Sequence, residues 1–357
     1  MPYSSRWTIT PPTISLPSFL FTSPSAKLSQ EPLIIDAERP STHFLSLYSY
    51  REWSKQFAAG LVAAGLRTGD RLMLFSGNSI FSPVVIMGTI MAGGIYTSGN
   101  PAFKARELAY QLKDSGASFL LAADNCVDRA LDGARLAGLE SSQVFFFHDL
   151  DARLTSKLEI HSAKGATESW TRLIQSPSDC RNFQWEQLDT PELANRTMVL
   201  FYSSGTTGLP KGVEASHYNI VSNICQLDKL QHPKALKNSG LTARGLCFLP
   251  MYHGLGLVYY SWIAPKRHLP VYMMVRFDLA KMLSHIQHYK ITELLMVPPV
   301  LIAMTKHPLV TSGRYDLSSI QKVLCGAAPL GMEVTLQFEK LWPHGALRVR
   351  QAYGMSE

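Results

Sequence analysis

The stretch that decides the fold is Tyr202-Ser203-Ser204-Gly205-Thr206-Thr207-Gly208-Leu209-Pro210-Lys211-Gly212-Val213. It directly follows an apolar, strand-like run over residues 197–201. The glycines allow backbone N–H groups to approach phosphate oxygens, the hydroxyls add donors, and the lysine adds positive charge. We therefore predict a polyphosphate-binding loop at the end of a strand, with Thr206, Thr207 and Lys211 as its main donors.

The spacing within this loop disfavours a conventional Walker-type ATPase. A Walker A loop follows the pattern G-x-x-x-x-G-K-[ST], in which Ser or Thr comes after the lysine. Gly205 and Gly208 lie closer together than that pattern allows, and Gly212 follows Lys211. The loop is therefore interpreted as another class of phosphate site, with a Gly/Ser surface turn as the alternative.

Three further blocks follow along the chain: Leu249-Pro250-Met251-Tyr252-His253-Gly254, Gly326-Ala327-Ala328-Pro329-Leu330-Gly331 and Gln351-Ala352-Tyr353-Gly354-Met355-Ser356-Glu357. In this order, the four blocks resemble the signatures of the adenylate-forming superfamily, which includes acyl- and aryl-CoA ligases, luciferases and peptide-synthetase adenylation domains. Gly69-Asp70-Arg71, Ala92-Gly93-Gly94 and Asn100-Pro101 are similar to the family as well. The resemblance covers nearly the whole chain and is closest to fungal 4-coumarate–CoA ligase-like proteins.

Helical and strand-like segments alternate, which predicts βαβ units around parallel sheets. Strands are expected near residues 72–75, 95–97, 118–122, 198–202, 246, 271–275, 294–297, 323–324 and 347–350. We expect two stacked α/β subdomains, residues 1–190 with an irregular N-terminal segment and residues 191–357 with the phosphate loop and the adenine-binding blocks. The blocks follow predicted strands, so one cleft at the carboxyl ends of the strands is expected to join them.

The resemblance implies that this is the large N-terminal domain of an adenylate-forming enzyme. The family's ribose-binding aspartate, its hinge and its C-terminal lid domain with an assisting lysine would follow Glu357, and we expect them to be absent from this chain.

The resemblance also implies how the blocks bind ATP and Mg²⁺. The loop residues that would hold the β- and γ-phosphates are Ser203, Ser204, Gly205, Thr206, Thr207, Gly208 and Lys211. The adenine would lie along Gly326, Ala327, Ala328 and Pro329 and stack on Tyr353, with Gln351 and Gly354 beside it. Ser356, where many relatives have Thr, would donate to the α-phosphate, and Glu357 would hold Mg²⁺ through its carboxylate. The alternative for Tyr353 is a buried core tyrosine.

The acyl substrate would lie near His253, which the resemblance places beside the reacting carboxylate. The alternative for His253 is a packed core histidine. Lys211, His253 and Ser356 are thus the catalytic candidates. Leu255, Tyr259 and Ala352 are pocket candidates beside His253, and the methyl group of Ala352 would narrow the pocket because many relatives have Gly there. No basic residue marks a second substrate charge, which indicates a hydrophobic aryl or medium-chain monocarboxylate, although core packing also explains these residues.

The activity implied by the resemblance is ATP-dependent formation of an acyl-AMP, followed by transfer of the acyl group to coenzyme A. A role in secondary metabolism follows from the fungal analogy alone. Two alternatives stay open: a truncated, non-catalytic nucleotide-binding homologue, and an adenylation unit that loads a carrier protein. Full turnover by this chain alone is not expected, because the lid domain's residues would be missing.

Composition excludes several other classes. The net charge of +7 comes from 34 basic and 27 acidic residues without a basic run, so no nucleic-acid partner is expected. The five cysteines are widely spaced, which favours a reducing, cytoplasmic compartment, with a peroxisomal one if a C-terminal signal has been lost. The most apolar stretch, residues 81–96, is shorter than the ~20 residues of a membrane span and contains Pro83. No membrane span is therefore expected, and the oligomeric state is not predicted.

Overall fold

The computed structural model describes residues 8–150, 167–203, 208–230, 242–342 and 347–356. Within them the strands form two seven-stranded sheets. The first has the order β7-β6-β5-β3-β4-β8-β9, with β3 (Arg71–Phe75), β4 (Ile95–Gly99), β5 (Ala117–Ala123), β6 (Val144–Phe147), β7 (Glu168–Ser169), β8 (Thr197–Ser203) and β9 (Lys211–Ser216). The second has the order β14-β13-β12-β10-β11-β1-β2, with β1 (Pro32–Asp36), β2 (Phe44–Ser46), β10 (Gly245–Cys247), β11 (Val271–Met273), β12 (Glu293–Met296), β13 (Lys322–Cys325) and β14 (Val349–Gln351).

The longer helices connect these strands: α2 (Leu47–Ala63), α3 (Ser82–Met91), α4 (Ala105–Ser115), α5 (Val127–Ala137), α7 (His217–Leu230), α10 (Leu279–Tyr289), α11 (Pro298–Lys306) and α13 (Met332–Glu339). Shorter ones are α1 (Leu16–Phe21), α6 (Pro191–Ala194), α8 (Gly254–Val258), α9 (Ala264–Lys266) and α12 (Pro308–Thr311), with 3-10 turns η1 (Asp124–Cys126), η2 (Ser141–Gln143) and η3 (Trp170–Leu173). A π-helical segment, η5 (Tyr259–Ile263), joins α8 to α9. Local sequence sets their ends: Ser46 and Ser49 form a capping box at the start of α2, and α4 and α5 each end at a left-handed glycine, Gly116 and Gly138.

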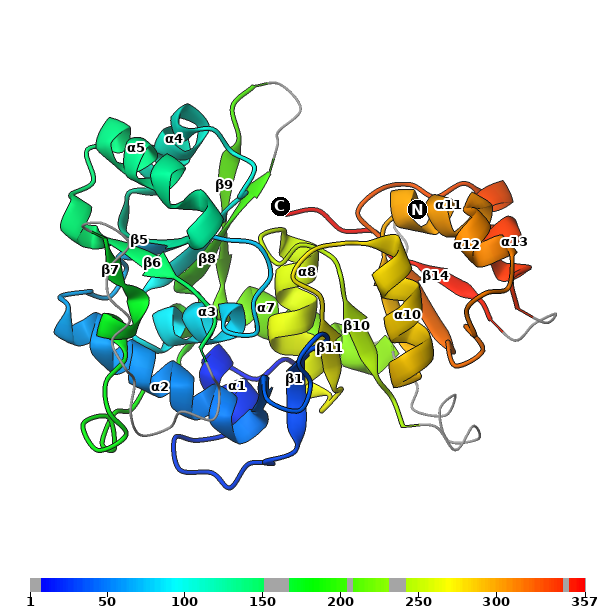
Figure 1. Cartoon of the computed structure of the whole chain (residues 1–357). Helices are drawn as coiled ribbons and strands as arrows, with labels where there is room; N and C mark the ends of the chain where they lie inside the picture. Colours follow the sequence, from blue (N-terminus) through cyan, green and yellow to red (C-terminus); the bar gives the residue numbers. More distant parts are fainter. Residues whose placement is uncertain (1–7, 151–166, 204–207, 231–241, 343–346, 357) are drawn as a thin grey trace, which may run out of the picture.

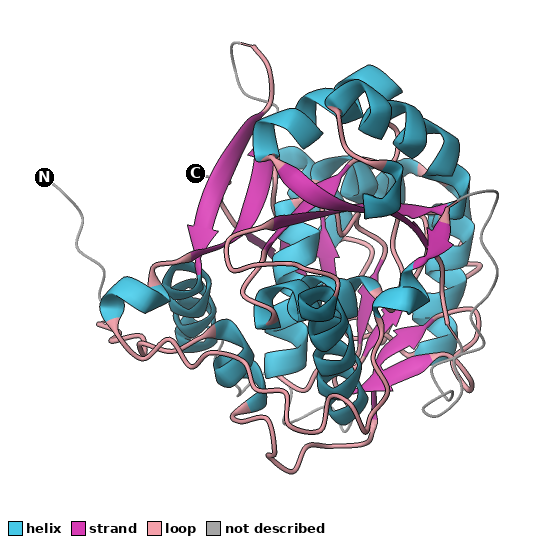
Figure 2. Ribbon diagram, turned by 90° about the vertical axis from the view of Figure 1, so that its left-hand side faces the viewer, coloured by secondary structure: helices cyan, strands magenta, loops and turns pink. Residues whose placement is uncertain are grey.

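The two sheets share one large core. Helices α4 and α5 cover one face of the first sheet, where Met73, Leu108, Leu120 and Ala130 form a separate apolar cluster. The larger cluster is continuous from α1, α2, α3 and α7 to the strands and helices of the second sheet. Figures 1 and 2 show helices packed on both sides of the strands. The expectation of two α/β units built on parallel-rich sheets is thereby confirmed.

The sheets do not follow the division that we expected at residue 190. Strand β1 lies in the second sheet because it pairs in parallel with β11, with Ile34 opposite Val271. Strand β8 lies in the first sheet because it pairs in parallel with β4, with Tyr96 opposite Val199. The N-terminal segment that we expected to be irregular, up to about Pro40, contains α1 and β1. Each sheet is therefore completed by chain from the other side of residue 190.

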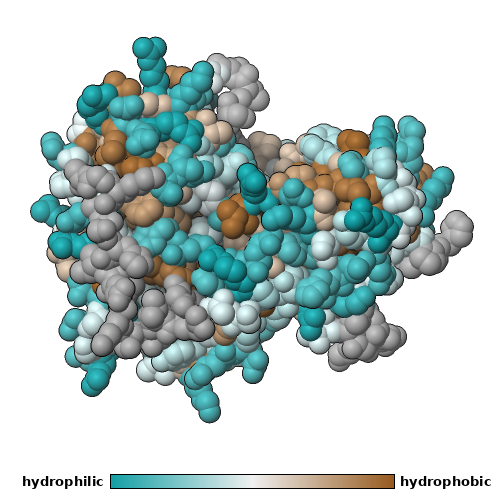
Figure 3. Space-filling model, in the orientation of Figure 1, coloured by the Kyte–Doolittle hydropathy of each residue, from teal (hydrophilic) through white to brown (hydrophobic). Residues whose placement is uncertain are grey.

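Hydrophilic and hydrophobic residues are interspersed over the face of the molecule shown in Figure 3. Exposed apolar side chains gather on α11 and α13, where Ile302, Met332 and Leu336 are 38%, 70% and 47% exposed. Among the residues that the structure describes, no helix combines the length and the apolar character needed to cross a membrane.

Candidate functional site

The phosphate-loop motif lies on a β-hairpin. Strands β8 and β9 pair antiparallel, with Tyr202 opposite Gly212 and Ser203 opposite Lys211. Lys211 is exposed at the start of β9, and a side chain added at Gly208 would meet open space. The predicted residues Ser204, Gly205, Thr206 and Thr207 lie outside the described residues. Strand β9 is the edge strand of the first sheet (Figure 1), and it begins with the exposed Lys211.

The segment that carries His253 is held by the other sheet's chain. The side-chain amide of Asn78, which follows β3, donates to the carbonyl oxygens of Leu249 at 3.0 Å and Met274 at 3.1 Å. Its Oδ1 accepts from the backbone N–H of Met251 at 2.8 Å. Ser98, in β4, donates to the carbonyl oxygen of Tyr252 at 2.9 Å. Residues 249–252 are therefore fixed by polar side chains at the carboxyl ends of β3 and β4.

His253 is exposed and caps the start of α8. Its carbonyl accepts from Leu257 N at 2.9 Å, and its ring lies 4.7 Å from the Tyr252 ring. Partial burial of the imidazole lowers the pKa of His253 below its usual value. The imidazole is therefore neutral at pH 7 and carries one N–H donor. Exposure argues against the alternative of a packed core histidine.

Close backbone approaches bring α8 against its neighbours. A Cβ added at Gly254 would lie 3.3 Å from Cδ1 of Phe201, in β8. A Cβ added at Gly256 would lie 2.3 Å from the carbonyl oxygen of Pro250, a backbone atom that cannot move aside cheaply. Glycine at residue 256 is thus required by packing, and Gly254 fits closely against Phe201, so α8 lies beside both β8 and the segment held by Asn78.

The third and fourth blocks meet α8 at Gly326. A Cβ added there would lie 3.3 Å from the carbonyl oxygen of Ala352 and 3.9 Å from Cδ2 of Leu255. Backbone bonds hold this junction: Gly326 N donates to Met296 O at 3.1 Å, and Ala352 N donates to Cys325 O at 2.8 Å. Two of the three pocket candidates, Leu255 and Ala352, therefore come together beside Gly326.

Ala327 has a left-handed backbone with φ of 71°, which costs an L-residue about 1 kcal/mol or more. It is exposed together with Ala328 and Pro329, so these small residues form an open backbone surface. Strained backbone of this kind clusters at ligand sites.

Tyr353 extends from the end of β14 with 91% of its surface exposed. Its hydroxyl contacts the sulfur of Met355 at 2.9 Å. A core tyrosine is thereby excluded, and the ring faces are available to a ligand. Gln351, Ala352 and Gly354 are exposed too, and Ser356 is half-buried. Figure 1 shows this C-terminal segment passing over α8 toward the β8–β9 hairpin.

The third pocket candidate, Tyr259, differs from the other two in its surroundings. It is 8% exposed, and its hydroxyl lies 3.5 Å from Oε2 of Glu293 and 3.4 Å from Arg267. Glu293 begins β12, so this contact is at the amino end of the second sheet, opposite the carboxyl ends where the blocks meet. We therefore leave Tyr259 out of the candidate site.

The donor set for Mg²⁺ is incomplete in the described part of the chain. Glu357, the predicted ligand, is not described, and the described residues contain no cluster of three or more His, Cys, Asp or Glu side chains suited to a metal. Mg²⁺ usually binds one or two carboxylates together with substrate phosphates and water. Glu357 therefore stays a predicted Mg²⁺ ligand.

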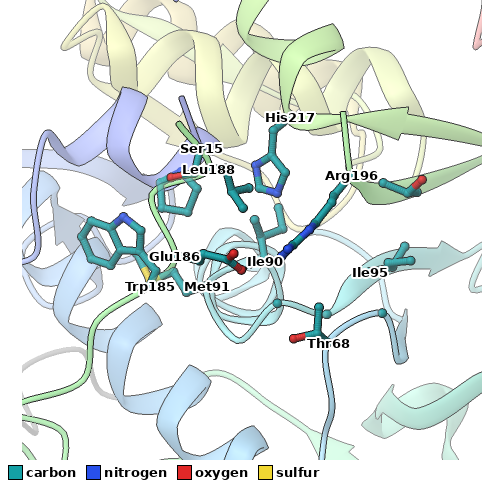
Figure 4. Close-up of a pocket in the computed structure, with 15 residues that line it drawn as sticks. Ser15, Thr68, Ile90, Met91, Ile95, Trp185, Glu186, Leu188, Arg196 and His217 are labelled. Atoms are coloured by element: carbon teal, nitrogen blue, oxygen red, sulfur yellow. Dashed lines mark hydrogen bonds and ion pairs between the residues drawn. The ribbon is translucent and has the colours of Figure 1, made fainter. Parts of the chain in front are cut away.

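A cavity of about 260 Å³ lies elsewhere, between Arg196, Glu186 and His217 (Figure 4). It is lined by Ile95 and Thr197, the first residues of β4 and β8. The phosphate hairpin leaves the opposite end of β8, about 20 Å away at a rise of about 3.3 Å per residue. This cavity is therefore separate from the four blocks.

Sequence reasoning missed the residues that hold the blocks in place. Asn78 and Ser98 were not singled out, although both lie at the carboxyl end of a strand, where ligand-side residues gather in parallel sheets. Position after a predicted strand is the signal that would have found them.

The chain is similar to known proteins over most of its length. A family model described as AMP-binding enzyme matches residues 27–357. A phenylacetyl-CoA ligase of Aspergillus niger is 32% identical over 329 residues, which are 92% of this chain and 58% of the relative. A 4-coumarate–CoA ligase of Pinus taeda is 32% identical over 333 residues, 93% of this chain and 56% of the relative. The chain spans a little over half the length of these curated relatives.

Solved structures resemble the fold. A long-chain-fatty-acid-CoA ligase of Archaeoglobus fulgidus matches with a TM-score of 0.78 and 24% identity, over 98% of this chain and 66% of that one. ATP-bound MatB of Rhodopseudomonas palustris matches with a TM-score of 0.73 and 22% identity, over 96% and 60%. At these identities the likeness concerns the fold alone. With the family match over most of its length, the chain belongs to the AMP-binding enzyme family.

Proposed function

We propose that the protein binds ATP and a hydrophobic monocarboxylic acid as part of an AMP-forming acyl- or aryl-CoA ligase. One observation carries the proposal. Blocks far apart in sequence and drawn from both sheets meet in a continuous run of close approaches, from Phe201 to Gly254 and from Leu255 through Gly326 to Ala352. A structural role alone does not require exposed Tyr353 and strained Ala327 at the same place.

The chemistry to be performed is activation of a carboxylate. A carboxylate oxygen bonds to the α-phosphorus of ATP, the bond from that phosphorus to the bridging oxygen breaks, and pyrophosphate leaves. The thiolate of coenzyme A then bonds to the acyl carbon, and AMP leaves. A protein accelerates the first step by holding both reactants in line and by placing donors where negative charge develops.

The nucleotide is assigned to three of the blocks. We propose that Lys211 and the hairpin hold the β- and γ-phosphates, that the backbone of 326–329 and the ring of Tyr353 enclose the adenine, and that Ser356 donates to the α-phosphate. Lys211 is exposed at the hairpin end, which supports the first assignment. Mg²⁺, when bound, would neutralise phosphate charge beside Glu357.

The acid is assigned to the region between His253 and Ala352. A neutral imidazole with one N–H can hydrogen-bond and orient a carboxylate oxygen without forming a tight ion pair. Leu255 and Ala352 offer an apolar wall there, which supports a hydrophobic acid. Relatives named phenylacetyl-CoA ligase and 4-coumarate–CoA ligase agree with an aryl acid and with coenzyme A as acceptor. We also propose a reducing, cytoplasmic location, because all five cysteines are free.

The test is to incubate the chain with MgATP and a panel of phenylacetate, 4-coumarate and hexanoate, and to measure pyrophosphate release and acyl-AMP by mass spectrometry. Acid-dependent pyrophosphate release that His253→Ala reduces about 100-fold supports the proposal. MgATP binding without release for any acid contradicts turnover by this chain and favours a non-catalytic nucleotide-binding protein. Acyl-AMP formation without transfer to coenzyme A favours loading of a carrier protein.

A further inference from the structure

We propose that helix α4 positions the phosphate hairpin through Tyr110 and Asp114. The inference rests on the proposed function, in which this hairpin holds the β- and γ-phosphates of ATP. The Tyr110 hydroxyl donates to the carbonyl oxygen of Pro210 at 3.0 Å, and the Tyr202 hydroxyl donates to Oδ2 of Asp114 at 2.6 Å. Tyr110 and Asp114 are four residues, about one helical turn, apart and lie on the same face of α4.

These two hydrogen bonds reach both strands of the hairpin. Tyr202 lies in β8 immediately before Ser203, and Pro210 lies immediately before Lys211, the first residue of β9. The two bonds therefore tie the chain on both sides of the hairpin end to a single helix.

Gly212, which follows Lys211, is part of the same set of contacts. Gly212 pairs with Tyr202 across the hairpin, and a Cβ added at Gly212 would lie 3.1 Å from both Cζ and Oη of Tyr202. The tyrosine ring thus crosses the space that a side chain at residue 212 would fill. Glycine at this position lets the ring lie across β9 and lets its hydroxyl reach Asp114.

The Tyr202 hydroxyl stays a hydrogen-bond donor at neutral pH. Burial of the ring, followed by the hydrogen bond to Asp114 and its charge, raises the pKa of Tyr202 well above its usual value. The phenol therefore keeps its proton near neutral pH and stays a donor to the carboxylate, and hydrogen bonds to charged groups are stronger than neutral ones.

Helix α4 is a firm support for these contacts. Glu107 accepts from the backbone N–H of Lys104 at its start, and left-handed Gly116 ends it. Leu108 and Leu112 bury its inner face in the cluster shared with α5. Because α4 is capped at both ends and packed on the core, fixing both sides of the hairpin to it lowers the conformational entropy lost when a phosphate binds.

The test measures MgATP and AMP dissociation constants by calorimetry for the whole chain and for Tyr110→Phe, Tyr202→Phe and Asp114→Ala. Each variant is expected to weaken MgATP about two- to tenfold, the effect of one hydrogen bond, and to leave AMP unchanged because AMP lacks the β- and γ-phosphates. The double variant Tyr202→Phe/Asp114→Ala should bind MgATP no more weakly than the single variant with the lower MgATP affinity, because both substitutions remove the same hydrogen bond. A role in positioning the hairpin predicts weaker MgATP binding with unchanged AMP binding, and a purely structural role does not.

The matched control is Tyr289→Phe, which removes another tyrosine-to-carbonyl bond, to Ala37 at 2.6 Å, away from the hairpin. It should leave both dissociation constants unchanged. Unchanged MgATP affinity in Tyr110→Phe and Tyr202→Phe, or equal weakening of AMP, overturns the positioning role while the proposed function stands. Failure of the unmodified chain to bind MgATP overturns both.

Discussion

Oδ1 of Asn78 accepts a hydrogen bond from the backbone N–H of Met251 at 2.8 Å, across 173 positions of sequence. The same side chain donates to two carbonyl oxygens in the second sheet's chain, and it is 6% exposed. This single residue therefore joins the carboxyl edge of the first sheet to the segment that leads into His253. The candidate site depends on these hydrogen bonds of Asn78 because its blocks come from both sheets.

We expect Asn78→Asp to lower the free energy of unfolding by about 2–4 kcal/mol. The aspartate keeps the acceptor for Met251 N but removes both donors, and it leaves the carbonyl oxygens of Leu249 and Met274 without a partner next to a buried charge. Urea denaturation at pH 7 measures the change.

The matched control is Asn100→Asp. Asn100 uses its Oδ1 to accept from Ala102 N at 3.0 Å, a bond that aspartate retains. It should change stability by less than about 0.5 kcal/mol. Equal effects of the two substitutions would contradict the joint proposed for Asn78.

A second prediction concerns the buried acid beside Tyr259. Glu293, whose side chain is 2% exposed, accepts from Arg267 at 2.9 and 3.0 Å and from Lys322 at 3.3 Å. Glu293→Gln should lower the free energy of unfolding by about 3 kcal/mol. Breaking a buried ion pair costs about 3–5 kcal/mol of stability, and the partial exposure of Arg267 and Lys322 reduces that cost. Asp132→Asn, which removes the exposed pair with Arg135, should cost less than about 0.5 kcal/mol. Thermal or urea unfolding compares them, and a small loss for Glu293→Gln would be evidence against a structural network there.

A third prediction is a loss of stability in mild acid that depends on His217. Nδ1 of His217 accepts from Leu16 N at 3.0 Å, and burial together with the charge of Arg196 lowers the pKa of His217 from 6.5 to about 4. The unfolded chain therefore binds a proton that the folded chain does not between these values, so this stabilisation is present above pH 6.5 and is lost as the pH falls toward 4.

Between pH 7 and pH 5 the linkage amounts to about 2 kcal/mol. His217→Asn, whose Oδ1 can still accept from Leu16 N, should lose about 2 kcal/mol less than the unmodified chain over that interval. Unfolding free energies at the two pH values give the comparison, and parallel losses would show that His217 titrates normally in the folded state.

The sequence was informative where local pattern and local structure coincide. The strand before the phosphate loop was expected at residues 198–202 and is β8, Thr197–Ser203. The strand expected at 72–75 is β3, Arg71–Phe75, because a short apolar run bounded by turn residues is typical of a buried parallel strand. The blocks at the ends of strands were identified by their resemblance to the signatures of the adenylate-forming superfamily.

The elements that were missed depend on partners far along the chain. Strand β9 begins with Lys211 and Gly212, which have low strand propensity, and it forms because it pairs with β8. Strand β1 lies in a proline-rich segment and is held by β11, with Ile35 opposite Tyr272. Tyr259 was taken for a pocket residue because spacing after His253 does not reveal that its hydroxyl turns to Glu293. Such long-range pairings leave no periodic signal in the sequence.

The most direct measurement is the MgATP dissociation constant of the chain beside those of Tyr353→Ala and Tyr353→Phe. Tyr353 is 91% exposed, so neither substitution should alter folding. If its ring stacks on adenine, Tyr353→Ala should weaken MgATP and AMP alike by about tenfold or more, and Tyr353→Phe should bind nearly as well as the unmodified chain, because stacking is worth about 1–3 kcal/mol per base. Failure of the unmodified chain to bind MgATP, or equal affinity in Tyr353→Ala, would contradict a nucleotide site at these blocks.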